Sequence, residues 1–314
     1  VANNQETNRT ENDSHVSQRA LREIYLKNFE IAVKESDPWT VMSSYNKMNG
    51  KYTQQNRELL TTVLRDEWGY KGIVMTDWGN KAGTVSAVNA GNDLMEPGSQ
   101  SEVDRIIAGV KDGSISEEQL NTNVRRMLEY IVRTPAFAGY RHSDRPDLEA
   151  HAQVARRAAA EGMVLLKNNG VLPLKGNETV ALYGTTSYDL IQGGTGSGMV
   201  NMKYVRSIKE GLEGDGFTVE PKLASWYKMF ADYADASLYN NGKVIWERPV
   251  LPEMEISEKF IVREVPQTDV AVLTIGRNAG EGSDRKVRDG DFTLDAVERQ
   301  LLQHICDAYH EAGK

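Results

Sequence analysis

The stretch Gly72-Ile73-Val74-Met75-Thr76-Asp77-Trp78-Gly79 is the segment from which the fold is predicted. Residues 73–76 are strand-like, since three apolar residues are followed by the β-branched Thr76, and such runs are typical of parallel sheets covered on both faces. A carboxylate and an indole follow at once. Polar residues just past the ends of such strands are the usual catalytic positions, so Asp77 is a candidate acid, with a helix N-cap as its alternative role. Trp78 offers a flat surface on which a sugar ring can stack.

The alternation of strand, loop and helix extends along the chain on both sides of this stretch. We expect strands at 40–45, 73–76 and 93–95, and helices at 14–34, 56–68, 85–90, 101–111 and 116–132, with Asn56 as a cap. After a helix at 148–162, a second unit has strands at 163–166, 180–183 and 270–275 and helices at 205–212, 223–239 and 294–312. We therefore predict an α/β chain with domains at 1–134 and 156–314, joined by a linker at 135–155.

Composition and charge exclude several classes of protein. Acidic residues outnumber basic ones by 45 to 37, and the resulting net charge of −8 disfavours nucleic acid as a partner. No apolar run reaches the roughly 18 residues of a membrane-spanning helix. Cys306 is the only cysteine, which favours a reducing compartment, and we expect a cytoplasmic, bacterial location. The five histidines lack metal-ligand spacing, so we expect neither a metal nor a cofactor.

Two glycine-rich segments of the second unit are further candidates. Residues 276–285, Gly-Arg-Asn-Ala-Gly-Glu-Gly-Ser-Asp-Arg, follow an apolar strand and place Glu281 between glycines, where it is either a functional acid or an ordinary surface residue. Residues 193–198, Gly-Gly-Thr-Gly-Ser-Gly, lack the Gly-Lys-Ser/Thr ending of a phosphate loop. We interpret this loop, with Ser197, as a contact for a neutral polar ligand, and nucleotide binding as the alternative.

Taken together, five motifs resemble glycoside hydrolase family 3, in particular its bacterial β-glucosidases. The motifs lie at residues 1–9, 41–46, 74–78, 160–168 and 193–198. The resemblance implies the C-terminal part of a (β/α)8-type barrel followed by the N-terminal part of an α/β sandwich domain. It also implies that a complementing segment or chain completes both domains, because the residues that would supply the first half of the barrel do not precede Val1.

The resemblance assigns roles to individual residues. Asp77 corresponds to the catalytic nucleophile and Glu281 to the acid/base, while Arg9, Tyr45, Trp78 and Ser197 correspond to residues that bind the sugar. The implied reaction is retaining hydrolysis of terminal, non-reducing β-D-glucosyl residues through a covalent glycosyl-enzyme, for which the two carboxyl groups lie about 5–5.5 Å apart.

Other functions stay open from the sequence. One is β-xylosidase-type specificity within the same family, and another is a non-catalytic module that binds carbohydrate or another protein. The expected ligand is a β-glucoside or an oligosaccharide, a homo-oligomer is one expected assembly, and the isolated chain is expected to show little activity without its complement.

Overall fold

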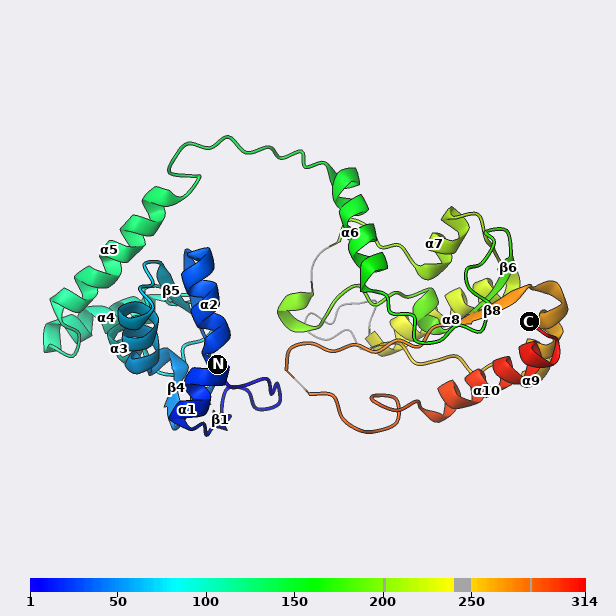
Figure 1. The fold of residues 1–314 in the computed structure, drawn as a ribbon, viewed down its shortest axis with the longest axis horizontal. Coiled ribbons are helices and arrows are strands. Elements are labelled where there is room, and N and C mark those ends of the chain that lie inside the picture. Colours follow the sequence, from blue (N-terminus) through cyan, green and yellow to red (C-terminus); the bar gives the residue numbers. More distant parts are fainter. Residues whose placement is uncertain (200–201, 240–249, 283) are drawn as a thin grey trace. The chain divides into compact units, whose positions relative to one another are not determined.

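The computed structural model describes residues 1–199, 202–239, 250–282 and 284–314. The chain divides into two compact units, Val1–Gln153 (unit 1) and Val154–Lys314 (unit 2), and each is described by itself. Both units combine helices with short strands that pair mainly in parallel (Figure 1). This arrangement confirms the α/β class that the sequence predicts.

In unit 1, the stretch at residues 72–79 includes one strand of a parallel pair. Strand β2 (Thr40–Ser43) pairs with β5 (Ile73–Thr76) in the register Thr40↔Ile73 to Ser43↔Thr76. The expected strand at 93–95 is reduced to a single parallel bridge between Leu94 and Met75. Most of β5 is buried, as its apolar sequence requires, because helices of unit 1 pack around it.

Helices and a small second sheet surround this pair. The segment expected as one helix at 14–34 is a succession of α1 (Gln18–Ala20), η1 (Leu21–Tyr25) and α2 (Lys27–Ser36). The helices that follow are η3 (Glu58–Glu67), α3 (Thr84–Ala90), α4 (Gln100–Asp112) and α5 (Glu117–Arg133), with the short turn η2 (Thr53–Gln55) before them. The second sheet joins β1 (Asp13–Ser14), β3 (Lys47–Met48) and β4 (Lys51–Tyr52). Asn56, the predicted cap, lies one residue before the N-cap position Arg57 of η3, and its side-chain oxygen accepts from the Leu59 N–H at 3.1 Å.

In unit 2, three parallel strands are ordered β7 (Thr218–Val219), β6 (Thr179–Tyr183) and β8 (Val270–Leu273). The central strand β6 is buried on both faces. Ala181 and Tyr183 belong to one apolar cluster, and Val180 and Leu182 belong to another, because successive side chains point to opposite faces. Helices that contribute to these clusters are α7 (Ile208–Gly214), α8 (Pro221–Tyr239), α9 (Glu258–Glu264) and α10 (Ala296–Glu311).

One expected strand is wrong. Helix α6 (Leu148–Gly162) has the predicted bounds, but residues 163–166 after it form no strand, and Leu166 is 93% exposed. A strand requires a hydrogen-bonded neighbour, which the apolar run Met-Val-Leu-Leu does not specify by itself. Helix α7 begins three residues later than expected because Ser207 and Glu210 form a capping box at its start.

In the described ranges, the sheets are open and have two or three strands, and they show neither a closed barrel nor a sandwich. None of the described helices is both long and apolar enough to cross a membrane.

Candidate active site

Asp77 lies directly after β5, where its backbone is fixed by the neighbouring strand. Its N–H donates to the carbonyl of Ser43 at 2.8 Å, which continues the β2–β5 pairing by one residue. Its side-chain Oδ1 accepts from the Trp78 N–H at 2.6 Å, and the indole of Trp78 is 69% exposed. Helix α3 begins at Thr84 after Gly83, so Asp77 is not its N-cap. The strand end thus presents a carboxylate beside an exposed aromatic ring.

A buried network of amides holds the loop that follows Asp77. The Ser43 hydroxyl donates to Asn92 Oδ1 at 2.6 Å, and Asn92 Nδ2 donates to the carbonyl of Gln54 at 2.7 Å. Gln54 Oε1 in turn accepts from the Lys81 N–H at 3.1 Å. Since Ser43 also binds the Asp77 N–H, the loop is anchored at both ends by one network. The sequence analysis missed these residues, because ordinary Asn, Gln and Ser carry no spacing signal.

A buried ion pair fixes the other end of β5. Arg65 Nη2 and Asp93 Oδ2 are 2.6 Å apart, and both side chains are almost fully buried. Asp93 Oδ2 also accepts from the Val74 N–H at 2.9 Å, and Arg126 contributes a second cation at 3.3 Å. Burial lowers the pKa of Arg65 and raises the pKa of Asp93, and the attraction between the two groups opposes both shifts. The pair therefore joins η3, β5 and α5 around the strand that carries Asp77.

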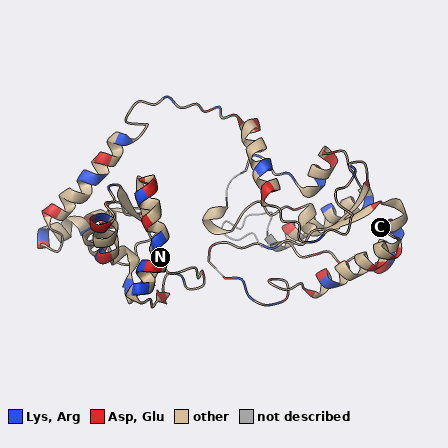
Figure 2. Cartoon of the chain, in the orientation of Figure 1, with Lys and Arg blue, Asp and Glu red and all other residues tan. Residues whose placement is uncertain are grey.

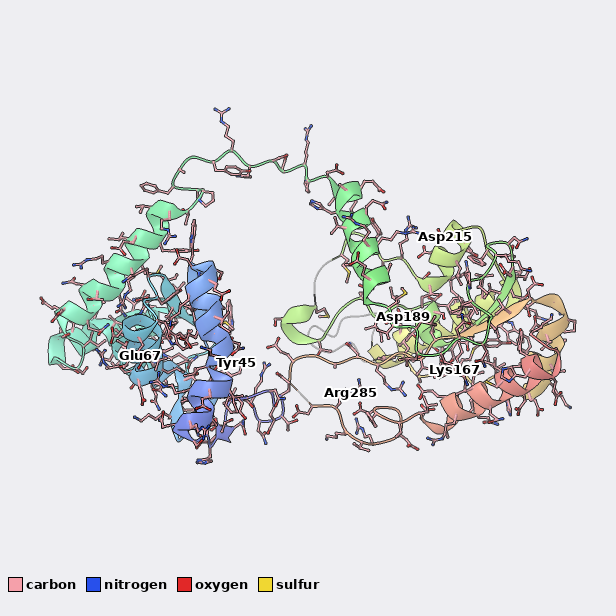
Figure 3. The ribbon with its side chains drawn as sticks, viewed as in Figure 1. Tyr45, Glu67, Lys167, Asp189, Asp215 and Arg285 are labelled. Carbon is pink, nitrogen blue, oxygen red and sulfur yellow. The ribbon has the colours of Figure 1, made fainter. Side chains whose placement is uncertain are left out.

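Arg9 and Tyr45 are brought together in unit 1. The guanidinium carbon of Arg9 lies 5.1 Å from the centroid of the Tyr45 ring, a cation–π distance, and Arg9 Nη1 lies 2.8 Å from Glu6 Oε2. Tyr45, labelled in Figure 3, follows the end of β2 by two residues. Because β2 and β5 are parallel, Tyr45 and Asp77 leave the sheet at the same edge. The stacked arginine is thereby held near this edge.

Ser197 and Glu281 are brought together in unit 2. The Ser197 N–H donates to Glu281 Oε2 at 2.5 Å, and the Ser197 hydroxyl donates to the same oxygen. The Thr195 hydroxyl contacts the Glu281 carbonyl at 3.4 Å. These residues lie in the loops that follow β6 and β8, neighbouring parallel strands whose carboxyl ends meet at one edge. The two glycine-rich segments that the sequence marks separately thus form one structure.

Glycines allow this close approach of the two loops. Gly196 has φ of +67°, and a Cβ there would lie 2.4 Å from Glu281 Cβ. A Cβ at Gly280 would lie 2.3 Å from the backbone nitrogen of Thr195. Any larger residue at either position would push the loops apart. The sequence shows the glycines, but the contact that requires them is visible only in the fold.

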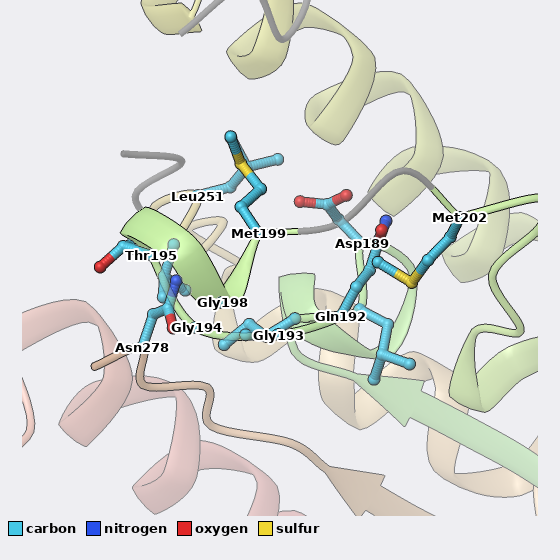
Figure 4. Close-up of a pocket in the computed structure, with 13 residues that line it drawn as sticks. Asp189, Gln192, Gly193, Gly194, Thr195, Gly198, Met199, Met202, Leu251 and Asn278 are labelled. Atoms are coloured by element: carbon cyan, nitrogen blue, oxygen red, sulfur yellow. The ribbon is translucent and has the colours of Figure 1, made fainter. Parts of the chain in front are cut away.

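The glycine-rich loop also lines a small pocket. Its walls include the backbone of residues 193–195 together with Asn278 and Met199 (Figure 4). The loop continues into a single 3₁₀ turn, Gly196–Gly198, whereas a phosphate loop leads into a long helix that directs its N–H groups at the ligand. The next described helix, α7, begins only at Ile208. The pocket therefore does not have the geometry of a nucleotide site.

Charges and potential metal ligands are dispersed over the described ranges. Figure 2 shows basic and acidic residues interspersed along the helices of both units. Within the residues that the structure describes, no group of three or more His, Cys, Asp or Glu side chains is placed to hold a metal ion.

Comparison with known proteins places the chain in a family. The glycosyl hydrolase family 3 N-terminal domain matches residues 3–130, and the C-terminal domain of the same family matches residues 163–312. The chain belongs to glycosyl hydrolase family 3.

Named relatives and solved structures agree with this assignment. Beta-glucosidase B of Emericella nidulans is 44% identical over 73% of this chain and 28% of its own length. An exo-alpha-(1->6)-L-arabinopyranosidase of Bifidobacterium longum is 35% identical over 98% of this chain and 39% of its own length. The structure of beta-glucosidase 3B from Thermotoga neapolitana, in complex with alpha-D-glucose, superposes with a TM-score of 0.93 and 46% identity over 100% of this chain. This chain spans 45% of that structure, so it covers less than half the length of each of these proteins.

Proposed function

We propose that this chain forms part of a retaining β-glucosidase that releases terminal, non-reducing β-D-glucosyl residues. The observation that carries the proposal is the position of Asp77, a carboxylate fixed at the end of the buried strand β5 beside the exposed Trp78. Relatives in the same family that carry the name β-glucosidase support the choice of substrate.

Asp77 and Glu281 divide the chemistry in this proposal. Asp77 attacks the anomeric carbon and forms a glycosyl-enzyme, and Glu281 gives a proton to the departing oxygen. In the second step Glu281 takes a proton from water, which attacks the same carbon and releases the sugar. The mechanism requires the two carboxyl groups to lie about 5–5.5 Å apart during catalysis. Because Asp77 belongs to unit 1 and Glu281 to unit 2, activity requires both units.

The remaining site residues bind the sugar. The stacking of Arg9 on Tyr45 holds the guanidinium in one orientation, and we assign to this guanidinium, a planar group of N–H donors, the binding of sugar hydroxyls. Trp78 covers an apolar face of the ring, for which its exposure is the supporting observation. The Ser197 hydroxyl adds a contact from unit 2.

The same proposal includes the architecture of the whole enzyme. We assign residues 1–134 to part of a (β/α)8-type barrel, 135–155 to a linker and 156–314 to part of an α/β sandwich domain. The parallel pairing of β2 with β5 and the parallel order β7-β6-β8 support this assignment. A complementing segment would supply the remaining strands, since the chain spans 45% of the solved Thermotoga neapolitana structure.

A chimera tests the proposal. This chain replaces the matching part of the Thermotoga neapolitana β-glucosidase 3B, which is 46% identical over the whole of this chain. The chimera should hydrolyse an aryl β-glucoside, Asp77→Ala should abolish hydrolysis, and the matched surface variant Asp66→Ala should leave it unchanged. A folded chimera that retains its activity after Asp77→Ala would contradict the proposal.

A second specificity is favoured by one comparison. The Bifidobacterium longum relative, named an exo-α-(1→6)-L-arabinopyranosidase, aligns over 98% of this chain. Aryl α-L-arabinopyranoside and aryl β-xyloside therefore belong beside aryl β-glucoside in the assay. Preference of the chimera for either one would replace glucose as the proposed sugar, and tight sugar binding without turnover by any substrate would indicate a binding module.

A further inference from the structure

We infer that Ser197 is a positioning residue for the carboxyl group of Glu281, in addition to its proposed contact with the sugar. The inference rests on the proposed function, because it concerns the residue that acts there as acid/base. It extends that function by assigning to the glycine-rich loop at 193–198 the task of orienting the proton donor.

Two donors from one residue bind one carboxylate oxygen. Ser197 offers both its N–H, 2.5 Å from Glu281 Oε2, and its hydroxyl to that oxygen. Two donors from a single backbone position fix both the place of the oxygen and the plane of the carboxyl group, which one flexible contact would not.

Close packing of the two glycine-rich loops brings Ser197 and Glu281 into contact. Gly196 lies against the Glu281 side chain and Gly280 against the backbone of Thr195, with no room for a Cβ at either glycine. Thr195 adds a hydroxyl contact to the Glu281 backbone carbonyl. Glu281 therefore lies against the loop that follows β6, and Ser197 of that loop binds the carboxylate.

A serine hydroxyl can perform both proposed roles at once. It donates its single proton to Glu281 and keeps lone pairs that accept from a sugar hydroxyl. One atom, Ser197 Oγ, thereby both binds the sugar and orients the acid. A residue that only bound sugar would affect all glucosides equally, whereas a residue that positions the acid affects most strongly those substrates whose leaving group requires a proton.

The first test uses the 314-residue chain and does not depend on turnover. An N–H that donates to a carboxylate resonates downfield in amide NMR spectra, so Glu281→Gln should move the Ser197 amide proton upfield. Glu178→Gln is the matched control, because the Glu178 carboxylate accepts from the N–H groups of Lys175 and Gly176. The inference would be overturned if the Ser197 amide proton shift did not change in Glu281→Gln while the amide proton shifts of Lys175 and Gly176 changed in Glu178→Gln.

The second test measures kcat/KM in the chimera. Ser197→Ala should lower kcat/KM about 10- to 100-fold more for an alkyl β-glucoside than for a dinitrophenyl β-glucoside, and Ser197→Thr should restore much of the loss. Equal losses on both substrates would overturn the positioning role. A chimera without hydrolysis whose Ser197 amide still responds to Glu281→Gln would contradict the proposed function while supporting the contact, so the two failures are distinguishable.

Discussion

The Ser197 N–H and the Glu281 carboxylate form a 2.5 Å hydrogen bond across 84 positions of sequence. The contact joins the loop after β6 to the loop after β8, and it depends on the absence of side chains at Gly196 and Gly280. Glu281, the candidate acid of one glycine-rich segment, is therefore hydrogen-bonded by the other glycine-rich segment, residues 193–198.

Gly196 and Gly198 form a matched pair that tests this packing. Gly196→Ala should destabilise the chain by about 1–3 kcal/mol, because the new Cβ meets Glu281 at a positive φ. Gly198→Ala adds its Cβ to open space and should change the free energy of unfolding by less than about 0.5 kcal/mol. Urea unfolding measures both, and equal stabilities for the two variants would show that the loops do not approach as described.

The buried pair Arg65–Asp93 should be among the most sensitive contacts of unit 1. Arg65→Met removes the cation nearest to the buried Asp93 and leaves the more distant Arg126 and the Val74 N–H, and we expect a loss of about 3–5 kcal/mol. Arg19→Met is the control, since its ion pair with Glu23 is exposed and contributes about 0.3–0.5 kcal/mol. Similar unfolding midpoints for the two variants would contradict the burial of Asp93.

Trp78 should matter for sugar binding and not for stability. Its ring is 69% exposed, so Trp78→Ala should leave unfolding of the chimera unchanged while weakening the binding of glucose, measured by calorimetry. Trp226, whose ring centroid lies 4.3 Å from that of Phe260, provides the opposite control. Trp226→Ala should lower stability and preserve glucose affinity; the reverse pattern would remove Trp78 from the sugar site.

Glu253 should make the stability of unit 2 depend on pH. Burial raises the pKa of its carboxyl above the ordinary value of 4.5, although the Tyr227 hydroxyl and the Thr185 N–H donate to it. A raised folded pKa means that the protonated form is favoured by folding, so this stabilising contribution falls as the pH rises from 4.5 through the folded pKa.

The variant Glu253→Gln cannot ionise and lacks this pH dependence. The free energy of unfolding of the wild type relative to this variant should therefore decrease as the pH rises above 4.5, as measured by urea unfolding. A difference that increases with pH would show that hydrogen bonds outweigh burial at Glu253.

Two of the strands that could be predicted, β5 and β6, are largely buried, and the apolar residues 73–75 and 180–183 explain why their pattern is clear. Strand β2 was predicted as well, although most of it is exposed or half-buried. Residues 163–166 show the same pattern but have no pairing partner, which a local pattern does not reveal. The short strand β7 (Thr218–Val219) is too brief to produce a period.

For the candidate site, the sequence indicated the reactive side chains but not the residues that hold them in place. Asp77 and Glu281 stand out in the sequence because each follows an apolar strand. Arg9 and Tyr45 were both predicted to bind the sugar, and the stacking of Arg9 on Tyr45 is consistent with that prediction. Asp93 was expected only as part of a short strand, and Asn92 carried no prediction from the sequence. Their role depends on partners up to 49 positions away, such as Ser43, which only the folded chain brings into contact.

The most direct test of the central claim follows the fate of azide in the Asp77→Ala variant of the chimera. If Asp77 is the nucleophile of a retaining enzyme, the variant should not hydrolyse an aryl β-glucoside, and added azide should occupy the vacated space and give an α-glucosyl azide. Formation of a β-glucosyl azide, or hydrolysis at the rate of the unsubstituted chimera, would contradict the assignment.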